Sequence, residues 1–485
     1  MIPSPLIDLL GDTEIISMNA AAAHVVVADV TQYSSRVTPG SLFCCRRGTQ
    51  TDGHRYALAA VRGGASALLV ERPLRLPVAQ VVVADMAKAI PRVAATAWGH
   101  PARHLRLVGV TGTNGKTTTT YLLRAIFESH GWPAEVIGTL SGPLTTPEPI
   151  ELQRRLAGMV ATGTEAVAME VSSHALVQGR VDATDFAVGV FTNLDRDHLD
   201  YHGDMDAYFE AKATLFAPDR VTVGVVNADD PWGRRLLETS RAPVVPYSTA
   251  DIHPIIDPSG STFRWRGQEI RIGLPGRFNT YNALAAATAA EALGVPTAEI
   301  AKALATADPP PGRMEIIDAG QPFRVIVDCA HTPSALQQAL DTASEATTGR
   351  LIVVFGCGGD RDRTKRPQMG AIVAHNADVG ILTSDNPRTE SAALIFADVL
   401  AGPGGSSLVV EEDRRRAIAL AVAIAAPGDT VLIAGKGDQT IQQVGPTSLP
   451  FDDRVVAREE IAAILEEGGA TGCPATVASS VRPYG

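Results

Sequence analysis

The sequence predicts an α/β protein of three domains, in which a central domain built on a parallel sheet lies between a small N-terminal α/β domain and a C-terminal Rossmann-like domain. Short apolar runs alternate with helical stretches along most of the chain, as they do in parallel sheets covered by helices. With 485 residues, 45% of them hydrophobic, the chain is long enough to bury several cores. The breaker cluster PPPG at 309–312 indicates a linker.

The first predicted domain covers residues 1–104. The apolar runs ALLVE (67–71) and AQVVVAD (79–85) predict two of its strands, and helical stretches separate them. The domain ends near WGHPARHLR, where the apolar pattern breaks. We expect a small α/β unit here.

The second and third predicted domains cover residues 105–311 and 312–467. Strand-like runs of the second domain are AVAME, FAVGVFTNL and VTVGVVNADD, and those of the third are FRVIVDCA, RLIVVFGCGG, ADVGILTSDN and DTVLIAGKGD. Helical stretches between the runs imply mostly parallel sheets. The small and polar tail at 468–485 is expected to be disordered.

The overall charge and the apolar runs exclude several classes of protein. A net charge of -11 argues against nucleic acid as a partner, since phosphate backbones recruit basic surfaces. No apolar run approaches the ~18 residues of a membrane span, and no basic region precedes a hydrophobic stretch at the start. We expect a cytoplasmic, monomeric protein without membrane insertion.

The stretch VTGTNGKTTTTYLL, which begins at Val110, has the features of a phosphate loop. Gly112 and Gly115 permit close backbone approach, and Lys116 begins a predicted helix whose free N–H groups favour an anion. The lysine would neutralise the β- and γ-phosphates of a nucleotide, and the Thr117 hydroxyl would ligate Mg²⁺. Valine replaces the first glycine of the strict pattern, so a glycine turn before a helix capped by threonine is the alternative. The residues expected to bind the nucleotide are Thr111, Gly112, Thr113, Asn114, Gly115, Lys116, Thr117 and Thr118.

Polar residues end two predicted strands of the central domain. Together with the phosphate loop, they predict that this domain is phosphate-loop ATPase-like. Glu170 closes AVAME, and Asp195, Asp197, His198 and Asp200 follow FAVGVFTNL. Open α/β sheets bind ligands at the carboxyl ends of their strands. Glu170 and His198 could thus complete the coordination of Mg²⁺ beside a triphosphate. Taken singly, Glu170 could be a helix cap and His198 a core histidine.

A series of motifs runs through nearly the whole chain, from about residue 30 to about residue 456. In order they are GVTGTNGKTTT, MEVSSHAL, TNLDRDHLDYHG, YFEAKATLF, GRFNTYNALAA, VDCAHTPSAL, GCGGDRDRTKRP, DNPRTE and IAGKGD. Together they resemble the Mur ligases of peptidoglycan assembly. Within that family they resemble the MurE-type enzymes, which add the third residue to UDP-N-acetylmuramoyl-L-alanyl-D-glutamate.

The resemblance implies a reaction that consumes ATP with Mg²⁺ as cofactor. ATP phosphorylates the γ-carboxylate of D-glutamate, and the amine of the incoming amino acid attacks the resulting acyl phosphate. Phosphate leaves far more easily than oxide, which explains why the acid must be activated. Because both transferring partners are anionic, most of the catalytic work should be positioning and charge neutralisation.

The resemblance also implies roles for residues of the central domain. Lys116 would contact the phosphates, and Thr117, Glu170 and His198 would hold Mg²⁺. Lys212, in YFEAKATLF, matches a lysine that becomes carbamylated and joins the metal site. Without the resemblance, Lys212 would be interpreted as a solvated helix lysine.

Further nucleotide contacts are implied on both sides of the linker. Asn282 matches an adenine contact, although an asparagine near a helix start is the plain alternative. Arg313 and Asp328 match nucleotide contacts of the third domain, where the aspartate receives the ribose hydroxyls. Lys365 would reach the transferring phosphoryl group when the domains close.

The UDP-sugar is expected across the first two domains. The segment SSRVTPGSLFCCRRGTQTDGH resembles the uridine-binding stretch, with Ser34 in place of the usual aspartate. Its implied contacts are Ser35, Arg36 and Gln50. The residues that match the muramoyl-dipeptide contacts are Thr145, Thr146, Ser172, Gln178 and Arg180. Arg180 could pair with a carboxylate, but each of these residues could also be an ordinary surface residue.

The amino-acid pocket is expected in the third domain, at Arg361, Asp385, Asn386, Arg388, Gly435 and Gln439. The arginine of DNPR clamps the distal carboxylate of diaminopimelate in family members that add this amino acid, and it would repel the side chain of lysine. The usual GKGHE is GKGDQ here, so Gln439 replaces the glutamate that pairs with the diaminopimelate ammonium. Losing such a contact costs on the order of 1 to 3 kcal/mol, which Asp438 could offset.

Three interpretations follow. The first is an ATP-dependent ligase for meso-diaminopimelate, or for L-lysine, another amino acid or another carrier. The second is a phosphate-loop switch or kinase, which predicts phosphate transfer without an amino acid. The third is a non-catalytic relative, which would have lost Lys116, Glu170 or Lys212; all three are present.

Overall fold

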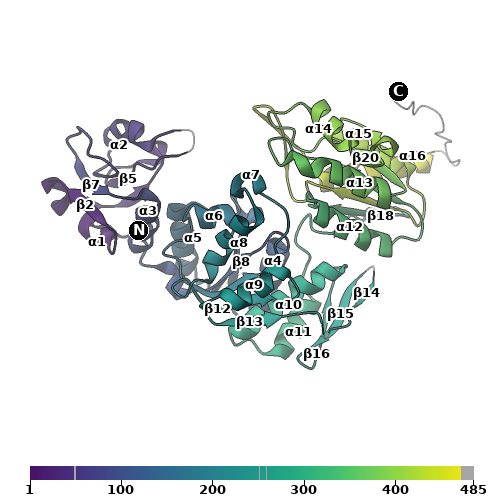
Figure 1. Cartoon of the computed structure of the whole chain (residues 1–485), viewed down its shortest axis with the longest axis horizontal. Coiled ribbons are helices and arrows are strands. Elements are labelled where there is room, and N and C mark those ends of the chain that lie inside the picture. The colour runs from purple at the N-terminus through teal and green to yellow at the C-terminus, as the bar shows by residue number, and fades with distance from the viewer. Residues whose placement is uncertain (49–50, 251, 258, 471–485) are drawn as a thin grey trace. The chain divides into compact units, whose positions relative to one another are not determined.

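The computed structural model describes residues 1–48, 51–250, 252–257 and 259–470 and divides the chain into two compact units (Figure 1). The first comprises Met1–Ile255, Ser261–Gly273 and Phe278–Asp308, and the second Ile256–Gly260, Leu274–Arg277 and Pro309–Gly485. The main boundary falls at Pro309, where the sequence predicted a linker. The three-domain boundaries within this division remain a prediction.

The N-terminal sheet of the first unit has the strand order β2-β7-β6-β5-β4. Its strands are β2 (Ile15–Met18), β4 (Asp29–Thr31), β5 (Ser41–Cys44), β6 (Ala67–Val70) and β7 (Ala79–Val83), and its helices are α1 (Leu6–Leu10), α2 (Ala57–Arg62) and α3 (Met86–Ala97). Strands β4 to β7 run parallel and β2 pairs antiparallel with β7. Alternate side chains face opposite sides of the sheet, so Phe43 packs with Ala57 of α2 and Leu42 packs in another cluster with Val93 of α3. Strands β1 (Ser4–Pro5) and β3 (Val26–Val27) form a separate pair. The two predicted strands are β6 and β7.

The central sheet of the first unit has the order β13-β12-β11-β8-β10-β9, and all neighbours are parallel. The strands are β8 (Arg106–Thr111), β9 (Ala134–Ile137), β10 (Ala166–Glu170), β11 (Phe186–Phe191), β12 (Val221–Asn227) and β13 (Val244–Tyr247). The chain passes from β8 outward to β9, back to β10, and then across β8 to β11. Such a reversal of strand order opens a crevice at the carboxyl ends, where ligands bind in open α/β sheets.

Helices and a small set of strands complete the first unit (Figure 1). The helices are α4 (Lys116–His130), α5 (Pro149–Ala161), α6 (Ser173–Val177), α7 (Leu199–His202), α8 (Met205–Ala213), α9 (Pro231–Thr239), α10 (Arg277–Ala292) and α11 (Thr297–Ala305). Strand β15 (Gly260–Trp265) pairs antiparallel with β16 (Gln268–Ile272), and β14 covers Ile255–Asp257, of which Ile256 and Asp257 are assigned to the second unit.

The second unit contains the sheet β17-β18-β22-β19-β20-β21, which is parallel except at β17. Its strands are β17 (Glu315–Ile316), β18 (Arg324–Asp328), β19 (Leu351–Phe355), β20 (Val379–Leu382), β21 (Val409–Val410) and β22 (Thr430–Ala434), followed by the hairpin of β23 (Ile441–Val444) and β24 (Thr447–Pro450). The helices are α12 (Pro333–Glu345), α13 (Arg366–Asn376), α14 (Ala392–Leu400), α15 (Arg414–Ile424) and α16 (Asp453–Ala470). The predicted Rossmann-like arrangement is confirmed. Helix α16 includes 468–470, and the rest of the predicted tail lies outside the described residues.

A buried ion pair ties the last helix of the second unit to its sheet. Both side chains of Arg414 and Asp453 are fully buried, and the arginine donates to the two carboxylate oxygens at 2.7 and 2.6 Å. It also donates to the carbonyls of Ala434, which ends β22, and of Ser384, which lies two residues after the end of β20. Burial lowers the pKa of Arg414, but the charge and the hydrogen bonds of Asp453, with the charge of Asp385, together outweigh burial and raise the pKa above its usual value.

Within the described residues, no helix is both long and apolar enough to cross a membrane.

Candidate active site

The phosphate loop joins β8 to α4 at the centre of the first unit's parallel sheet. Gly112 has φ +150° and Gly115 has φ +85°, and side chains are unfavourable at both. A Cβ atom on Gly112 would lie 1.9 Å from the Thr192 hydroxyl, and one on Gly115 would lie 2.3 Å from Oδ1 of Asn282. The N-cap of α4 is Gly115, so the alternative of a helix capped by threonine is wrong. A helix N-terminus without a side-chain cap presents N–H groups that suit an anion.

Residues at the end of β11 hold this loop in place. The side-chain oxygen of Asn193 accepts from the backbone N–H of Asn114 at 2.9 Å, and the Thr192 hydroxyl donates to the Asn114 carbonyl at 2.6 Å. The carbonyl of Asn193 accepts from the backbone N–H of Thr113 at 2.9 Å. Sequence reasoning missed both residues, although TNL follows an apolar run directly, which is the signal that singled out Glu170.

Two lysines converge on one carbonyl of the loop. Lys116 donates to the carbonyl oxygens of Gly112 and Thr113 at 2.9 and 2.8 Å. Lys212, in α8, donates to the same Gly112 oxygen at 2.9 Å and is 1% exposed. The interpretation of Lys212 as a solvated lysine is therefore wrong. Burial, and then the nearby charge of Lys116, lower the pKa of Lys212 well below its usual value, which favours the neutral amine.

Glu170 lies beside the start of α4. It ends β10, is 1% exposed and accepts from the Thr117 hydroxyl at 2.9 Å. The backbone N–H of Thr139, which sequence reasoning missed, donates to the same carboxylate oxygen at 3.0 Å. The helix that follows is capped by Ser172, so the alternative of Glu170 as a helix cap is wrong. Gly138 fits closely against the carboxylate, because a Cβ atom there would lie 2.3 Å from Oε1.

His198 lies in a group of aromatic rings near the same edge of the sheet. Its ring centroid is 4.8 Å from that of His174 and 6.3 Å from that of Tyr208. Burial lowers the pKa of His198 to about 3 despite the carboxylate of Asp197, and the charges of Lys116 and Lys212 act in the same direction as burial. The imidazole is therefore neutral at pH 7 and has a lone pair available for a ligand.

The donors near the loop fit a divalent cation only in part. No group of three or more His, Cys, Asp or Glu side chains in the described ranges is arranged to hold a metal ion. Thr117 and Glu170 nevertheless place two oxygen atoms 2.9 Å apart. Mg²⁺ prefers oxygen ligands and usually takes one or two carboxylates together with substrate phosphates and waters. These residues thus suit a magnesium ion that arrives with a nucleotide.

The residues predicted to contact the muramoyl dipeptide form one hydrogen-bonded group. The Thr146 hydroxyl donates to the Glu170 carbonyl at 2.9 Å, and the Thr146 carbonyl accepts from Arg180 at 2.9 Å. Gln178 accepts from Arg180 at 2.7 Å. Arg180 also pairs with Glu148 at 3.1 Å, a partner that sequence reasoning missed. The remaining members, Thr145 and Ser172, lie 3.1 Å from the Thr139 hydroxyl and 3.4 Å from the Thr146 hydroxyl.

The predicted uridine contacts lie in the N-terminal part of the first unit. Ser35 and Arg36 are exposed in a 3-10 helix over Ser34–Arg36. Arg36 pairs with Glu151 at 3.7 Å. Gln50 lies outside the described residues. The structure therefore leaves these two side chains at the surface.

The predicted nucleotide residues of the second unit lie near the end of β18. Asp328 is 8% exposed and accepts from the backbone N–H groups of Met314 and Ala330 at 2.8 and 2.9 Å. Burial raises its pKa, and the charge of Arg313 opposes the rise. Lys365 is 7% exposed and donates to the His331 carbonyl at 2.8 Å.

A hydrogen-bond network fixes the predicted amino-acid pocket of the second unit. Oδ1 of Asn386 accepts from Lys436 at 3.2 Å and from the backbone N–H of Gln443 at 2.8 Å. The amide nitrogen of Asn386 donates to Oε1 of Gln439 at 2.7 Å. Gly435 lies against Asp385, since a Cβ atom there would be 2.8 Å from the carboxylate.

Arg361 and Arg388 lie close to Gly358. A Cβ atom on Gly358 would lie 2.9 Å from a guanidinium nitrogen of Arg388 and 3.8 Å from Cγ of Arg361. Burial, and then the charge of Arg361, lower the pKa of Arg388. Two arginine side chains beside one glycine supply positive charge, which Asp385 and Asp360 offset in part, and such a region suits an anionic group.

Known proteins match most of the length of this chain. Residues 27–106 match the catalytic domain of the Mur ligase family, residues 110–290 the Mur ligase middle domain, and residues 312–437 the Mur ligase glutamate ligase domain. A UDP-N-acetylmuramoyl-L-alanyl-D-glutamate–2,6-diaminopimelate ligase of Geobacillus thermodenitrificans is 44% identical over 456 residues, covering 88% of this chain and 93% of the relative. An enzyme with the same name from Halalkalibacterium halodurans is 45% identical, with coverage of 88% and 93%. A solved structure of an enzyme with this name superposes with a TM-score of 0.67 at 32% identity and covers 96% of this chain and 100% of that one.

Proposed function

Because the chain belongs to the Mur ligase family, we propose that it is an ATP-dependent ligase that joins meso-diaminopimelate to the γ-carboxylate of D-glutamate in UDP-N-acetylmuramoyl-L-alanyl-D-glutamate. ADP and phosphate are the other products, and the reaction is a step of peptidoglycan precursor synthesis. The observation that carries the proposal is the convergence of Lys116, Lys212 and the Thr117–Glu170 pair at the carboxyl edge of the central sheet.

The chemistry requires an activated acid. A γ-carboxylate oxygen attacks the terminal phosphorus of ATP, ADP leaves, and an acyl phosphate forms. The amine then attacks the acyl carbon, phosphate leaves with the former carboxylate oxygen, and the amine nitrogen loses a proton. Lys116 and the N-terminus of α4 stabilise the negative charge of the phosphates during the first step.

Four residues near the loop serve the metal site. Mg²⁺ held by Thr117, Glu170 and His198 would neutralise phosphate charge when the nucleotide binds. Lys212 acts as a carbamate, which forms when its neutral amine takes up CO₂ and releases a proton. The buried amine with its lowered pKa suits this reaction because only the neutral form is a nucleophile.

The second unit selects the amino acid. Arg361 and Arg388 supply positive charge for the distal carboxylate of diaminopimelate. Lysine lacks this carboxylate, and its side-chain ammonium would be repelled. Gln439 supports a second candidate, the same chemistry with a different amino acid, because its oxygen already accepts from Asn386 and it bears no charge for a substrate ammonium.

One assay tests the proposal. The purified protein is incubated with ATP, Mg²⁺ and the UDP-muramoyl dipeptide, amino acids are added one at a time, and the mass of each nucleotide product is recorded. We expect the mass of the diaminopimelate adduct, together with one phosphate for each product. Product formed only with lysine or another amine would replace the assigned substrate, and phosphate release without any adduct would overturn the ligase assignment.

A further inference from the structure

Two loops leave neighbouring strands at the carboxyl edge of the second unit's sheet. One follows β19 and the other follows β20, and these two strands are paired in parallel. Each loop holds a non-glycine residue in the left-handed region, Asp360 at φ +54° and Arg388 at φ +51°. Such residues keep this conformation only where surrounding contacts fix it. The contacts that do so identify what positions Arg388.

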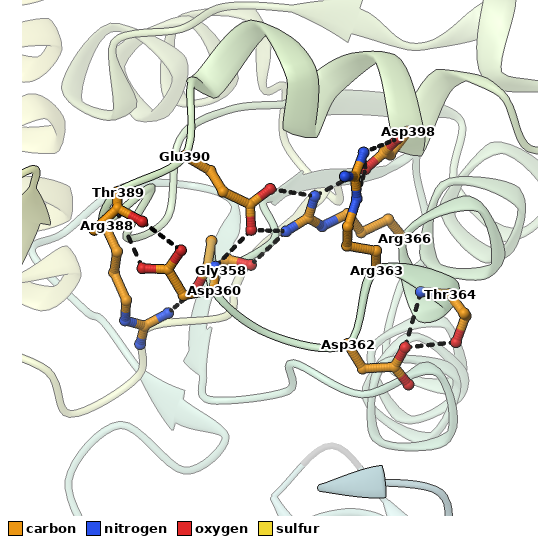
Figure 2. A network of polar contacts seen from close by, with 11 residues as sticks. Gly358, Asp360, Asp362, Arg363, Thr364, Arg366, Arg388, Thr389, Glu390 and Asp398 are labelled. Carbon is orange, nitrogen blue, oxygen red and sulfur yellow. Dashed lines mark hydrogen bonds and ion pairs between the residues drawn. The ribbon is translucent and has the colours of Figure 1, made fainter. Parts of the chain in front are cut away.

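The loops are bonded directly to each other (Figure 2). The Asp360 carboxylate accepts from the hydroxyl and the backbone N–H of Thr389, at 2.6 and 3.2 Å. The backbone N–H of Asp360 donates to Glu390 at 2.6 Å, and Arg388 donates to the Gly359 carbonyl at 2.6 Å. Neither loop can move without breaking contacts to the other.

Arg366 is hydrogen-bonded to both loops. Its side chain has 0% exposure, and its two terminal nitrogens donate to the two oxygens of Glu390 at 2.9 and 2.8 Å. It also donates to Asp398 of α14 at 2.8 Å and to the Gly358 carbonyl at 3.3 Å (Figure 2). Arg366 directly follows Lys365 in the chain. A guanidinium without exposure is costly to bury, and the bidentate pair with Glu390 offsets that cost while fixing the geometry.

We propose that Arg366 and Glu390 are positioning residues that hold Arg388 in place for the amino-acid substrate. The inference rests on the proposed function only for the identity of that substrate. Neither residue touches the substrate. Glu390 acts by joining the loop that carries Arg388 to the loop that carries Asp360, and Arg366 anchors this junction to α13 and α14.

The first test is Glu390→Gln in the full chain. An amide of the same shape has one oxygen, so it cannot accept all three hydrogen bonds that the carboxylate accepts. We expect KM for diaminopimelate to rise by on the order of tenfold or more, because small displacements of a binding group cost this much. KM for ATP should stay near that of the wild type.

The matched control is Asp429→Asn. Asp429 pairs with Arg350 at 2.7 Å, its side chain is 5% exposed, and it precedes β22 at the opposite, amino-terminal edge of the same sheet. This change removes a carboxylate–arginine pair of the same kind and should lower the melting temperature without changing KM for diaminopimelate. If KM for diaminopimelate changes equally in Glu390→Gln and in the control, the Arg366–Glu390 pair only stabilises the fold, and the proposal is overturned.

A second measurement separates this proposal from the proposed function. Hydrogen exchange of the substrate-free proteins should show faster exchange of both loops, 358–365 and 385–390, in Glu390→Gln and in Arg366→Met. In kinetics, the double variant should raise KM no further than the worse single variant, because the two residues act as a unit. Unchanged exchange, or additive effects on KM, would refute the coupling. If the wild type uses another amino acid, the proposed substrate is wrong. The same comparison, made with that amino acid, still tests the role of the Arg366–Glu390 pair.

Discussion

Replacing Lys212 with alanine tests whether this position supplies a negative or a positive charge to the reaction. The structure places the amine 2.9 Å from the Gly112 carbonyl oxygen, and the amine of Lys116 lies at the same distance from that oxygen. The two nitrogens are therefore no further apart than twice this distance. At about 5 Å and an effective dielectric constant of about 20, two ammonium groups repel by about 3 kcal/mol.

That repulsion adds to the burial of Lys212, and both favour the neutral amine that reacts with CO₂. If the carbamate is the working form, Lys212→Ala removes a preorganised anion from the reaction site. Loss of one such group lowers kcat by about 100- to 1000-fold. The alanine leaves space for a small carboxylate, so acetate or propionate should restore part of the activity.

The assay is phosphate release coupled to formation of the adduct, measured with acetate, propionate or methylamine added. Lys88→Ala is the control, because its side chain is 73% exposed and lies in the N-terminal part of the chain. Rescue by carboxylates alone supports the carbamate. Rescue by methylamine, or activity equal to that of the control, would show that the position acts as a cation or has no role.

Three further predictions concern charged residues of both units. Lys116→Ala should lower ligation by at least about 100-fold with an unchanged melting temperature, and retained turnover would contradict the phosphate assignment. Arg388→Ala should raise KM for diaminopimelate by about 10- to 100-fold, because a charge-assisted pair is lost; an unchanged KM would remove the clamp. Asp453→Asn should destabilise the second unit by about 3 to 5 kcal/mol in denaturant titrations, because it leaves the Arg414 guanidinium buried without its counter-charge. The exposed Asp206→Asn, whose side chain is 72% exposed, is the comparison, and equal losses would refute this estimate.

Much of the fold follows from the apolar runs. AVAME is β10 from its first residue to its last, and the run that begins at Phe186 forms β11. Such runs are readable because strands buried on both faces need apolar residues at every position. The placement of Glu170 was predictable for the same reason, since a carboxylate that ends a buried strand lies at the ligand-binding edge.

The burial of Lys212 could not be predicted from its local sequence. EAKA within a helix is typical of a solvated face, and the side chain is buried only because α8 packs against a carbonyl 100 positions earlier in the chain. Thr139 and Glu390 were missed for a similar reason, as their partners lie 31 and 24 positions away. A glutamate that follows DNPR and an arginine that follows Lys365 were visible in the sequence, but only the fold shows that they pair.

The pair formed by Arg414 and Asp453 has a consequence for how the protein is made. A ribosome releases β20, with the loop that carries Ser384, and β22, which carries Ala434, before it releases the helix that supplies the carboxylate. Until that helix emerges, the guanidinium cannot enter the interior without a counter-charge, so the second unit should complete its folding only late in translation. A nascent chain stalled before this helix would leave the carboxyl edge of the second unit's sheet incompletely folded and accessible to proteases.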